Sequence, residues 1–204
     1  MKSIKKNDQN SVNFIQNKSM ELSLLLSLPA TLALLIASRE IVGSLFGYGS
    51  FSSQDIDYTS SALTYFAYGV PAFALVKVLS NFYFARDNTK FPFYVSLISM
   101  VLNVVISVSL FRKFGFIIIP IATSISAWIG TIAYLILLTR NRYLNFGYKH
   151  LMNFFKILIA TFLMTIFLYY GLDYFEDKFE YTYIFKLIYL SIMIGAAGII
   201  YLFI

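Results

Sequence analysis

Long apolar segments separated by short polar turns constrain this chain more than any other feature of its sequence. Each segment is about as long as the roughly 20 residues that a helix needs to cross a bilayer. Apolar residues make up 59% of the 204 residues and charged residues only 13%, whereas soluble domains carry about 25% charge. We therefore expect an all-α integral membrane protein.

Six transmembrane helices are predicted from the apolar segments. They cover residues 21–38, 57–84, 91–111, 116–138, 151–171 and 183–204. The second segment is longer than a bilayer requires and contains Pro71, so this helix should tilt or kink. Only a short link, 112–115, joins the third and fourth helices, which should therefore be antiparallel neighbours.

On this interpretation the chain has three parts. Residues 1–20 form a polar, lysine-rich segment, for which an interfacial helix and a loop fit equally well. Residues 21–138 hold the first four helices, and residues 139–204 hold a basic loop followed by the last two helices.

The distribution of charge predicts the topology. The net charge is +6, but the basic residues are scattered among short loops, which is typical of the positive-inside rule rather than of nucleic-acid binding. We therefore expect both ends of the chain and the basic segments 86–90 and 140–150 in the cytoplasm. The acidic segments 39–57 and 172–180 should lie outside, and the basic link after the third helix is the one exception to the pattern.

Residues for catalysis are scarce. Catalysis by side chains needs a nucleophile with a base, paired carboxylates or a metal cluster. The chain has no cysteine and one histidine, His150, which lies in a basic segment and is expected to be solvated. No acidic residue occurs within a predicted helix after Asp57. We expect neither an enzyme nor an organic cofactor.

Two features of the predicted helices stand out because polar groups are costly in a bilayer. Lys77, with Asn81 four residues later on the same face, interrupts an apolar helix, where a charge costs about 2.5–3.5 kcal/mol. It should face protein or the cytoplasmic interface.

The third helix carries a polar stripe with helical spacing, which should also point into protein or water. The stripe consists of Ser96, Ser99, Asn103 and Ser107.

Several short motifs, taken in order, carry a resemblance. They are LPA at 28–30, IVGSLFGYGSFS at 41–52, AYGVPAFALVKVL at 67–79, FYFARDNTK at 82–90 and ATSISAW at 122–128. In this order they resemble the MurJ (MviN) family of lipid II flippases. The resemblance implies the fourteen-helix fold shared by multidrug, oligosaccharidyl-lipid and polysaccharide exporters. This chain is similar to helices nine to fourteen, the carboxyl-terminal part.

The resemblance also implies a function. Such proteins move undecaprenyl-linked peptidoglycan precursor, lipid II, across the bacterial cytoplasmic membrane by alternating access. The expected partners are this precursor, membrane lipids and the missing amino-terminal helices, on the same or a separate chain. Lys77, Asn81 and Arg86 are the candidates for contacting substrate or lining the cavity. The alternatives are an exporter of another polyprenyl-linked saccharide or small molecule, and a membrane fragment that does not transport.

Some members of the resembling family hold a sodium ion in this part of the fold. Matching their motif places an amide at Asn103, the carboxylate position at Ser107, a backbone carbonyl at Ile119 and a hydroxyl at Thr123. Ser107 departs from the family pattern because it carries no charge. The alternative interpretation is that Asn103 and Thr123 form a hydrogen bond between the third and fourth helices.

The last two helices of the family are thought to receive the isoprenoid tail of the substrate. In this chain Gly195 and Gly198 are the corresponding groove candidates. Small residues that serve only helix packing in lipid are the alternative.

Overall fold

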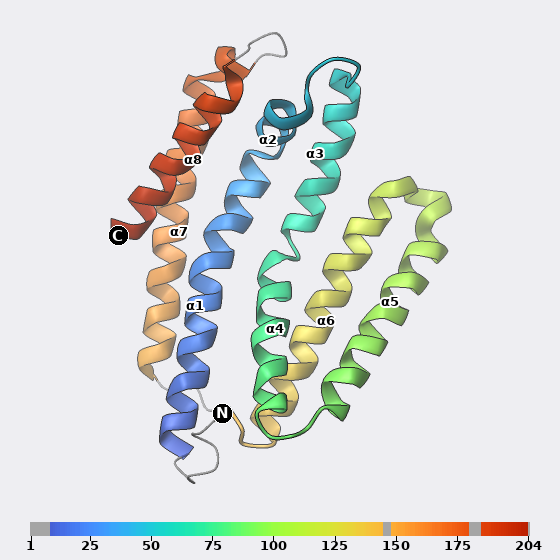
Figure 1. Ribbon diagram of the computed structural model, residues 1–204, viewed down its shortest axis with the longest axis vertical. Helices are drawn as coiled ribbons and strands as arrows, with labels where there is room; N and C mark the ends of the chain where they lie inside the picture. The colour runs from blue at the N-terminus through green and yellow to red at the C-terminus, as the bar shows by residue number, and fades with distance from the viewer. Residues whose placement is uncertain (1–8, 145–147, 180–184, 204) are drawn as a thin grey trace.

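The structure is a computed structural model that describes residues 9–144, 148–179 and 185–203, and within these ranges it is helical with no strand. The helices are α1 (Gln9–Ile36), α2 (Ser38–Phe46), α3 (Ser53–Ala67), α4 (Val70–Phe84), α5 (Lys90–Phe114), α6 (Ile118–Arg140), α7 (Tyr148–Tyr174) and α8 (Lys186–Phe203), with the short 3₁₀ turns η2 (Gly115–Ile117) and η3 (Glu176–Phe179) (Figure 1). The predicted all-α membrane fold is confirmed.

Five stretches of the described chain are long and apolar enough to cross a membrane. The longest, Lys90–Arg140, contains both α5 and α6, which pack against each other as the predicted antiparallel pair. The first helix is longer than expected, since α1 begins at Gln9 and includes the described part of the polar N-terminal segment. The last helix begins at Lys186, and the predicted start at 183 lies outside the described residues.

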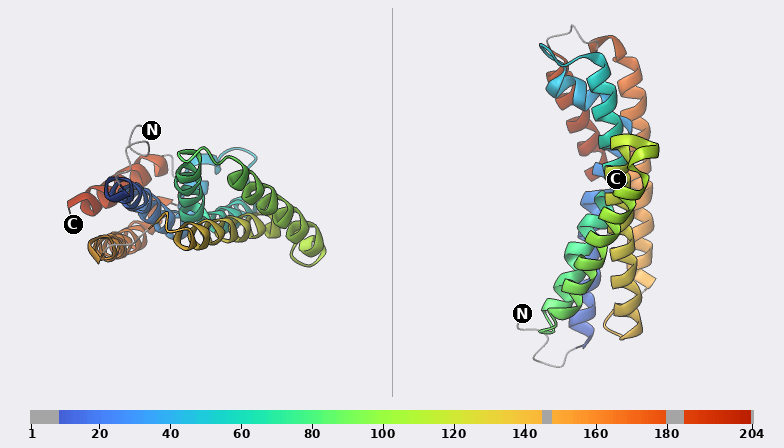
Figure 2. Two further views of the ribbon diagram at one scale, coloured as in Figure 1. Left: turned by 90° about the horizontal axis from the view of Figure 1, so that it is seen from below. Right: turned by 90° about the vertical axis from the view of Figure 1, so that its right-hand side faces the viewer.

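The membrane-spanning segments alternate in direction, with α3 and α4 running the same way as two halves of one segment, as the predicted topology requires (Figure 1). The α2–α3 loop and η3 lie at one end of the molecule (Figure 1). The start of α1, the α4–α5 turn and the last turn of α6 lie at the other, which we call the cytoplasmic end after the predicted topology. Seen from below, the bundle is flattened, with α7 and α8 at one side and α5 at the other (Figure 2).

A break divides the predicted second helix into α3 and α4. The two residues at the break are Tyr68 and Gly69, and Pro71 follows in the first turn of α4, where its missing N–H is tolerated. Gly69 leaves room for Ser124 of α6, because a Cβ at residue 69 would lie 2.7 Å from the Ser124 hydroxyl. The predicted kink therefore exists and begins just before the proline.

Helix α6 supplies hydrogen-bond donors to backbone carbonyls around this break. Such carbonyls need partners because no water is present in the bilayer core. Three side chains spaced along one face of α6 provide them: Ser124 Oγ donates to Tyr65 O at 2.6 Å, Trp128 Nε1 to Tyr68 O at 2.9 Å, and Thr131 Oγ1 to Ala72 O at 3.1 Å. Both α3 and α4 are thus tied to α6.

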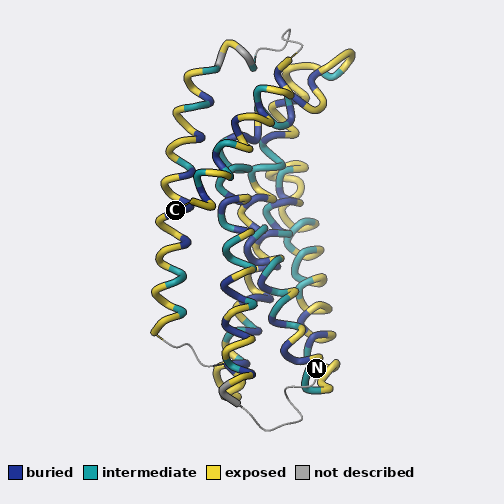
Figure 3. Tube along the Cα trace, turned by 60° about the vertical axis from the view of Figure 1, so that its left-hand side comes forward, coloured by how far each residue is buried: buried dark blue, intermediate teal, exposed yellow. Residues whose placement is uncertain are grey.

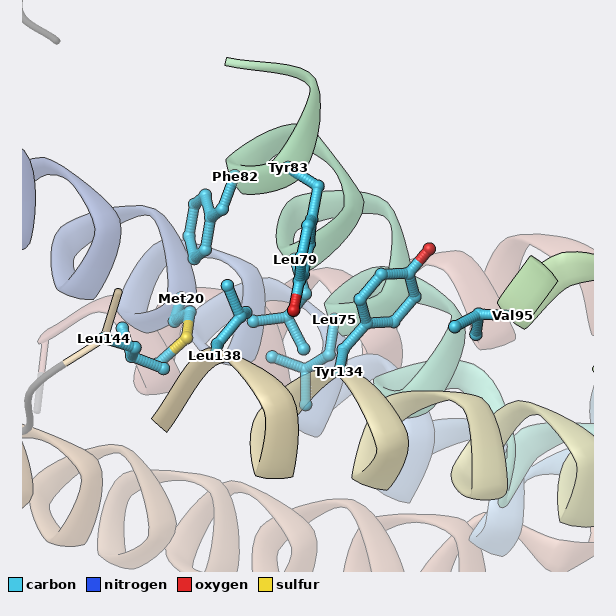
Figure 4. Close-up of a cluster of buried hydrophobic side chains, with 9 residues drawn as sticks. All are labelled: Met20, Leu75, Leu79, Phe82, Tyr83, Val95, Tyr134, Leu138 and Leu144. Carbon is cyan, nitrogen blue, oxygen red and sulfur yellow. The ribbon is translucent and has the colours of Figure 1, made fainter. Parts of the chain in front are cut away.

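Buried side chains form two clusters, and exposed positions lie on the outer sides of the helices (Figure 3). The first cluster joins α1, α4, α5 and α6 (Figure 4) and comprises Met20, Leu75, Leu79, Phe82, Tyr83, Val95, Tyr134, Leu138 and Leu144. The second joins α7 and α8 to the end of α1 and comprises Ala37, Ala160, Met164, Leu168, Leu172, Leu190, Met193, Ala197 and Tyr201.

A proline in α1 creates the point where α8 is attached. Pro29 has no N–H and so cannot donate to the carbonyl of Leu25 four residues earlier. The hydroxyl of Tyr201 in α8 donates to this carbonyl at 2.8 Å. The helix breaker in α1 therefore provides an acceptor that a neighbouring helix uses.

Candidate functional site

The candidate site is a groove on the open face of α4, α5 and α6, with a volume of about 360 Å³. Polar side chains from α5 and α6 line it together with apolar residues, and α4 contributes Phe73 and Val76. The polar residues are Ser96, Ser99, Asn103, Thr123 and Ser126. The predicted stripe therefore faces a groove rather than the centre of a helix contact, although Ser107 is not among the lining residues.

Hydrogen bonds connect the four residues of the predicted sodium motif. Asn103 Nδ2 donates to Thr123 Oγ1 at 2.8 Å, which joins α5 to α6. Thr123 Oγ1 donates in turn to the carbonyl of Ile119 at 2.8 Å, and Ser107 Oγ lies 3.4 Å from Asn103 Oδ1. The structure thus brings together the four positions and contains the helix-to-helix hydrogen bond that the second interpretation expects.

The donor set of this cluster does not fit a sodium ion well. Its oxygens are all neutral, the amide nitrogen of Asn103 points at Thr123, and no acidic residue is among those that line the groove. A dehydrated cation needs enough negative charge from its ligands to offset its lost hydration. Without a carboxylate at residue 107, these residues favour hydrogen bonding over ion binding, and sodium binding stays a prediction.

Lys77 and Asn81 are exposed on α4. Helical spacing puts Lys77 four residues after Phe73, which lines the groove, so the same face of α4 leads from the groove to Lys77 and Asn81 toward the cytoplasmic end. No described residue makes a hydrogen bond or ion pair with the Lys77 ammonium. A role for Lys77 or Asn81 in binding substrate stays a prediction.

Arg86 lies in the turn after α4 and contacts protein rather than the groove. Its guanidinium donates to the carbonyls of Phe82 at 2.6 Å and Tyr143 at 3.3 Å, and lies 4.4 Å from the centre of the Tyr143 ring. With its amide suitably oriented, Gln16 of α1 accepts from the guanidinium at 2.9 and 3.1 Å. Burial lowers the pKa of Arg86, but a guanidinium stays protonated at neutral pH. Arg86 therefore joins α1, the end of α4 and the segment after α6.

The groove candidates on α8 lie on its outer surface. A Cβ added at Gly195 or Gly198 would have no neighbour within 4 Å. The described chain leaves this side of α8 open, and binding of an isoprenoid tail there stays a prediction.

His150 is not the solvated loop residue that the sequence predicted. Helix α7 begins at Tyr148, so His150 lies in its first turn, half-buried against α1. There its Nδ1 forms a short hydrogen bond with Oε1 of Glu21, a residue only 8% exposed. Asn153 Nδ2 donates to the same oxygen at 3.2 Å, and Lys18 Nζ donates to Oε2 at 3.3 Å. In the sequence, only the position of Glu21 at the start of an apolar segment indicated a polar contact. No nearby residue identified His150 as its partner.

Lys186 at the start of α8 is a second polar contact that sequence reasoning missed. It is 1% exposed, and its Nζ donates to the carbonyl of Gly47 at 2.8 Å and lies 4.2 Å from the Tyr48 ring centre. Gly47 ends α2, so the ammonium lies at the negative end of that helix dipole. A Cβ at residue 47 would lie 2.5 Å from the Gly43 carbonyl, which explains the glycine.

Comparisons with known proteins agree on one family. The model of the family described as "Lipid II flippase MurJ" matches residues 2–190. A solved structure named "Lipid II flippase MurJ, inward closed conformation" superposes with a TM-score of 0.76 at 27% identity, over 97% of this chain and 39% of that chain.

Curated relatives show the same similarity. "Probable lipid II flippase MurJ" of Rickettsia prowazekii is 39% identical over 61% of this chain and 24% of its own length. The protein of the same name from Buchnera aphidicola subsp. Schizaphis graminum is 29% identical over 96% of this chain and 38% of its own length. "Lipid II flippase MurJ" of Thermosipho africanus is 28% identical over 85% of this chain and 34% of its own length. The chain thus spans about a quarter to two fifths of the relatives that it matches.

Proposed function

The chain belongs to the MurJ family of lipid II flippases, and from this premise we propose that it forms part of a transporter that moves lipid II across the membrane by alternating access. It is a multi-pass protein of the bacterial inner membrane and resembles the carboxyl-terminal part of the family. The observation that carries the proposal is the superposition of 97% of the chain on a MurJ structure.

The arrangement of polar groups supports a transport role. The open face of α4, α5 and α6 presents hydroxyls, one amide and the exposed ammonium of Lys77, all on helices with the length and composition of membrane spans. Polar groups at membrane depth mark substrate pathways in transporters. A cation near this face suits the diphosphate of a lipid-linked precursor. No chemical reaction is assigned to these residues, and we propose that the chain contributes binding and movement rather than catalysis.

We further propose that the remaining surface of this face is completed by amino-terminal helices of the family fold, supplied on the same or on a separate chain. Helix α5 has only Pro92 and Val95 buried along its 25 residues, so most of its surface is available to them. The substrate would then pass between the two groups of helices.

A chimera tests the proposal. The matching part of the Thermosipho africanus relative is replaced by this chain, and the purified chimera is reconstituted into vesicles containing fluorescent lipid II. We expect lipid II to move between leaflets faster than in vesicles with the relative truncated at the same junction. A folded chimera that is no faster than the truncated control would contradict the proposal.

The same assay separates the two interpretations of Lys77. We expect Lys77→Gln to reduce the initial rate several-fold while leaving expression unchanged, because the charge would be lost from the substrate path. Lys90→Gln, at an exposed lysine in the first turn of α5, is the matched control. Full activity of the Lys77 variant would leave this residue as a lysine that only reaches the membrane interface.

A further inference from the structure

A second groove, of about 260 Å³, lies on the seam between α1 and α7 and is separate from the face described above. Helix α1 contributes Lys18, Leu22 and Leu25 to its lining, at the i, i+4, i+7 spacing of one helix face. Helix α7 contributes Asn153 and Lys156. The groove thus combines two cations and an amide donor with an apolar wall.

The two lysines lie on either side of the contact between Glu21 and Asn153. Helices α1 and α7 run in the same direction, and the hydrogen bond from Asn153 to Glu21 shows which residues are level with each other (Figure 1). Lys18 is three residues before Glu21 and Lys156 is three residues after Asn153, so at about 1.5 Å per residue their Cα atoms are roughly 9 Å apart along the helix axes. Leu22 and Leu25 follow Lys18 toward the middle of the membrane, and Leu22 is 50% exposed. The groove therefore has cationic side chains from both helices beside an apolar wall on α1.

The local charges leave an excess of positive charge. Glu21 is the one acidic residue of the lining, and both of its oxygens already accept hydrogen bonds, from His150 and Asn153 on one side and from Lys18 on the other. Lys18 uses one of its three donors in this way. Lys156 is exposed and has no ion-pair partner within the described ranges.

Lys149 adds to this excess. It is exposed and precedes Asn153 by four residues and Lys156 by seven, so all three lie on one face of α7. The lysines at 18, 149 and 156 outnumber the single carboxylate of the groove, which gives a local charge of +2 from these four side chains.

We propose that this groove binds an anionic phospholipid of the cytoplasmic leaflet, such as phosphatidylglycerol. The lysines and the amide of Asn153 hold the phosphate, and one acyl chain lies along Leu22 and Leu25. Basic pockets between transmembrane helices at the cytoplasmic side recognise anionic headgroups through this combination of charge and apolar contact. A lipid bound there bridges α1 and α7 beside the Glu21–His150 contact.

Lipid retention measured by native mass spectrometry tests the proposal with the whole chain purified in a neutral detergent. Phosphatidylglycerol and phosphatidylcholine are supplied at equal concentration. Since each lysine near an anionic headgroup favours binding by about fivefold, we expect two lysines to favour retention of phosphatidylglycerol by at least about tenfold. Equal retention of the two lipids would overturn the proposal.

Variants show whether binding is at this groove. Lys18→Gln combined with Lys156→Gln should abolish the preference, whereas Arg112→Gln combined with Lys113→Gln, which removes the same charge at the opposite end of the molecule, should keep it. Lys156→Gln alone changes an exposed, unpaired side chain and should lower the preference several-fold, so the test does not depend on folding of the double variant. An unchanged preference in either lysine variant would place the lipid elsewhere.

A soluble headgroup distinguishes a lipid site from a phosphate site. Thermal unfolding is followed with added phosphatidylglycerol or with glycerol 3-phosphate at the same concentration. We expect the melting temperature to rise with the lipid only, because the acyl chain supplies part of the contact. An equal rise with glycerol 3-phosphate would mean that the groove binds phosphate groups in general and would overturn the lipid assignment.

Discussion

Breaking the contact between Glu21 and His150 should loosen α7 from α1. Glu21 is 8% exposed, and its carboxylate has three donors, of which His150 makes the shortest contact. A hydrogen bond to a charged group contributes about 1.5–3 kcal/mol, and bonds between membrane helices average about 0.6 and reach about 1.7 kcal/mol. Since Asn153 and Lys18 remain in the variant, we expect His150→Ala to cost about 1.5 kcal/mol, roughly a tenfold change in the unfolding equilibrium.

A double-mutant cycle isolates this contact from the loss of packing. Glu21→Gln, His150→Ala and the double variant are unfolded reversibly in mixed micelles of increasing SDS content, with helix content followed by circular dichroism. The two changes should be coupled by about 1 kcal/mol, because each of them removes the same contact and it can be lost only once. His150→Phe is the matched control, since it keeps a ring beside Phe14, whose ring centre lies 6.4 Å from that of His150. Additivity within about 0.3 kcal/mol would refute the reasoning.

Four further outcomes are expected. Thr131→Val should destabilise the fold by about 0.6–1.5 kcal/mol in the same unfolding assay, because it removes one of the three donors around the α3–α4 break; an unchanged midpoint would contradict this role. Tyr201→Phe should cost about as much, with protease cleavage of α8 as the sensitive readout. Thermal stability should be the same in sodium as in potassium, and a sodium-specific stabilisation lost in Asn103→Ala would instead establish an ion site. Single cysteines at Ser52 and Asp177 should react with an impermeant reagent from outside the cell, and labelling from the cytoplasm alone would invert the topology.

Local and periodic features of the fold could be predicted from the sequence. The helices follow from runs of apolar residues, and Ser52 with Asp55 forms the capping box that its spacing indicates: the Asp55 amide donates to Ser52 Oγ at 3.2 Å and the Ser52 amide to Asp55 Oδ2 at 2.9 Å. The closeness of Asn103 and Thr123 could be predicted, because the short link between α5 and α6 makes these helices antiparallel neighbours.

Contacts between distant segments could not be predicted in this way. Glu21 and His150 are 129 residues apart, and Lys186 and Gly47 are 139 residues apart. Each residue looks isolated in its own segment, and the pairing depends on which helix faces overlap after α7 and α8 have packed. The contact was also missed because α7 begins at Tyr148 rather than at the predicted residue 151, which places His150 on the surface of a helix instead of in a loop.

The hydrogen bonds from α6 to both sides of the α3–α4 break have a mechanical consequence. Ser124 is hydrogen-bonded to the end of α3 and Thr131 to the start of α4, so α6 fixes the angle between these two helices. Straightening or sharpening the bend would break these bonds in a medium that offers no water to replace them. We therefore expect α3, α4 and α6 to move as one stiff body in any change of conformation, with the displacement at its contacts with neighbouring helices rather than within it.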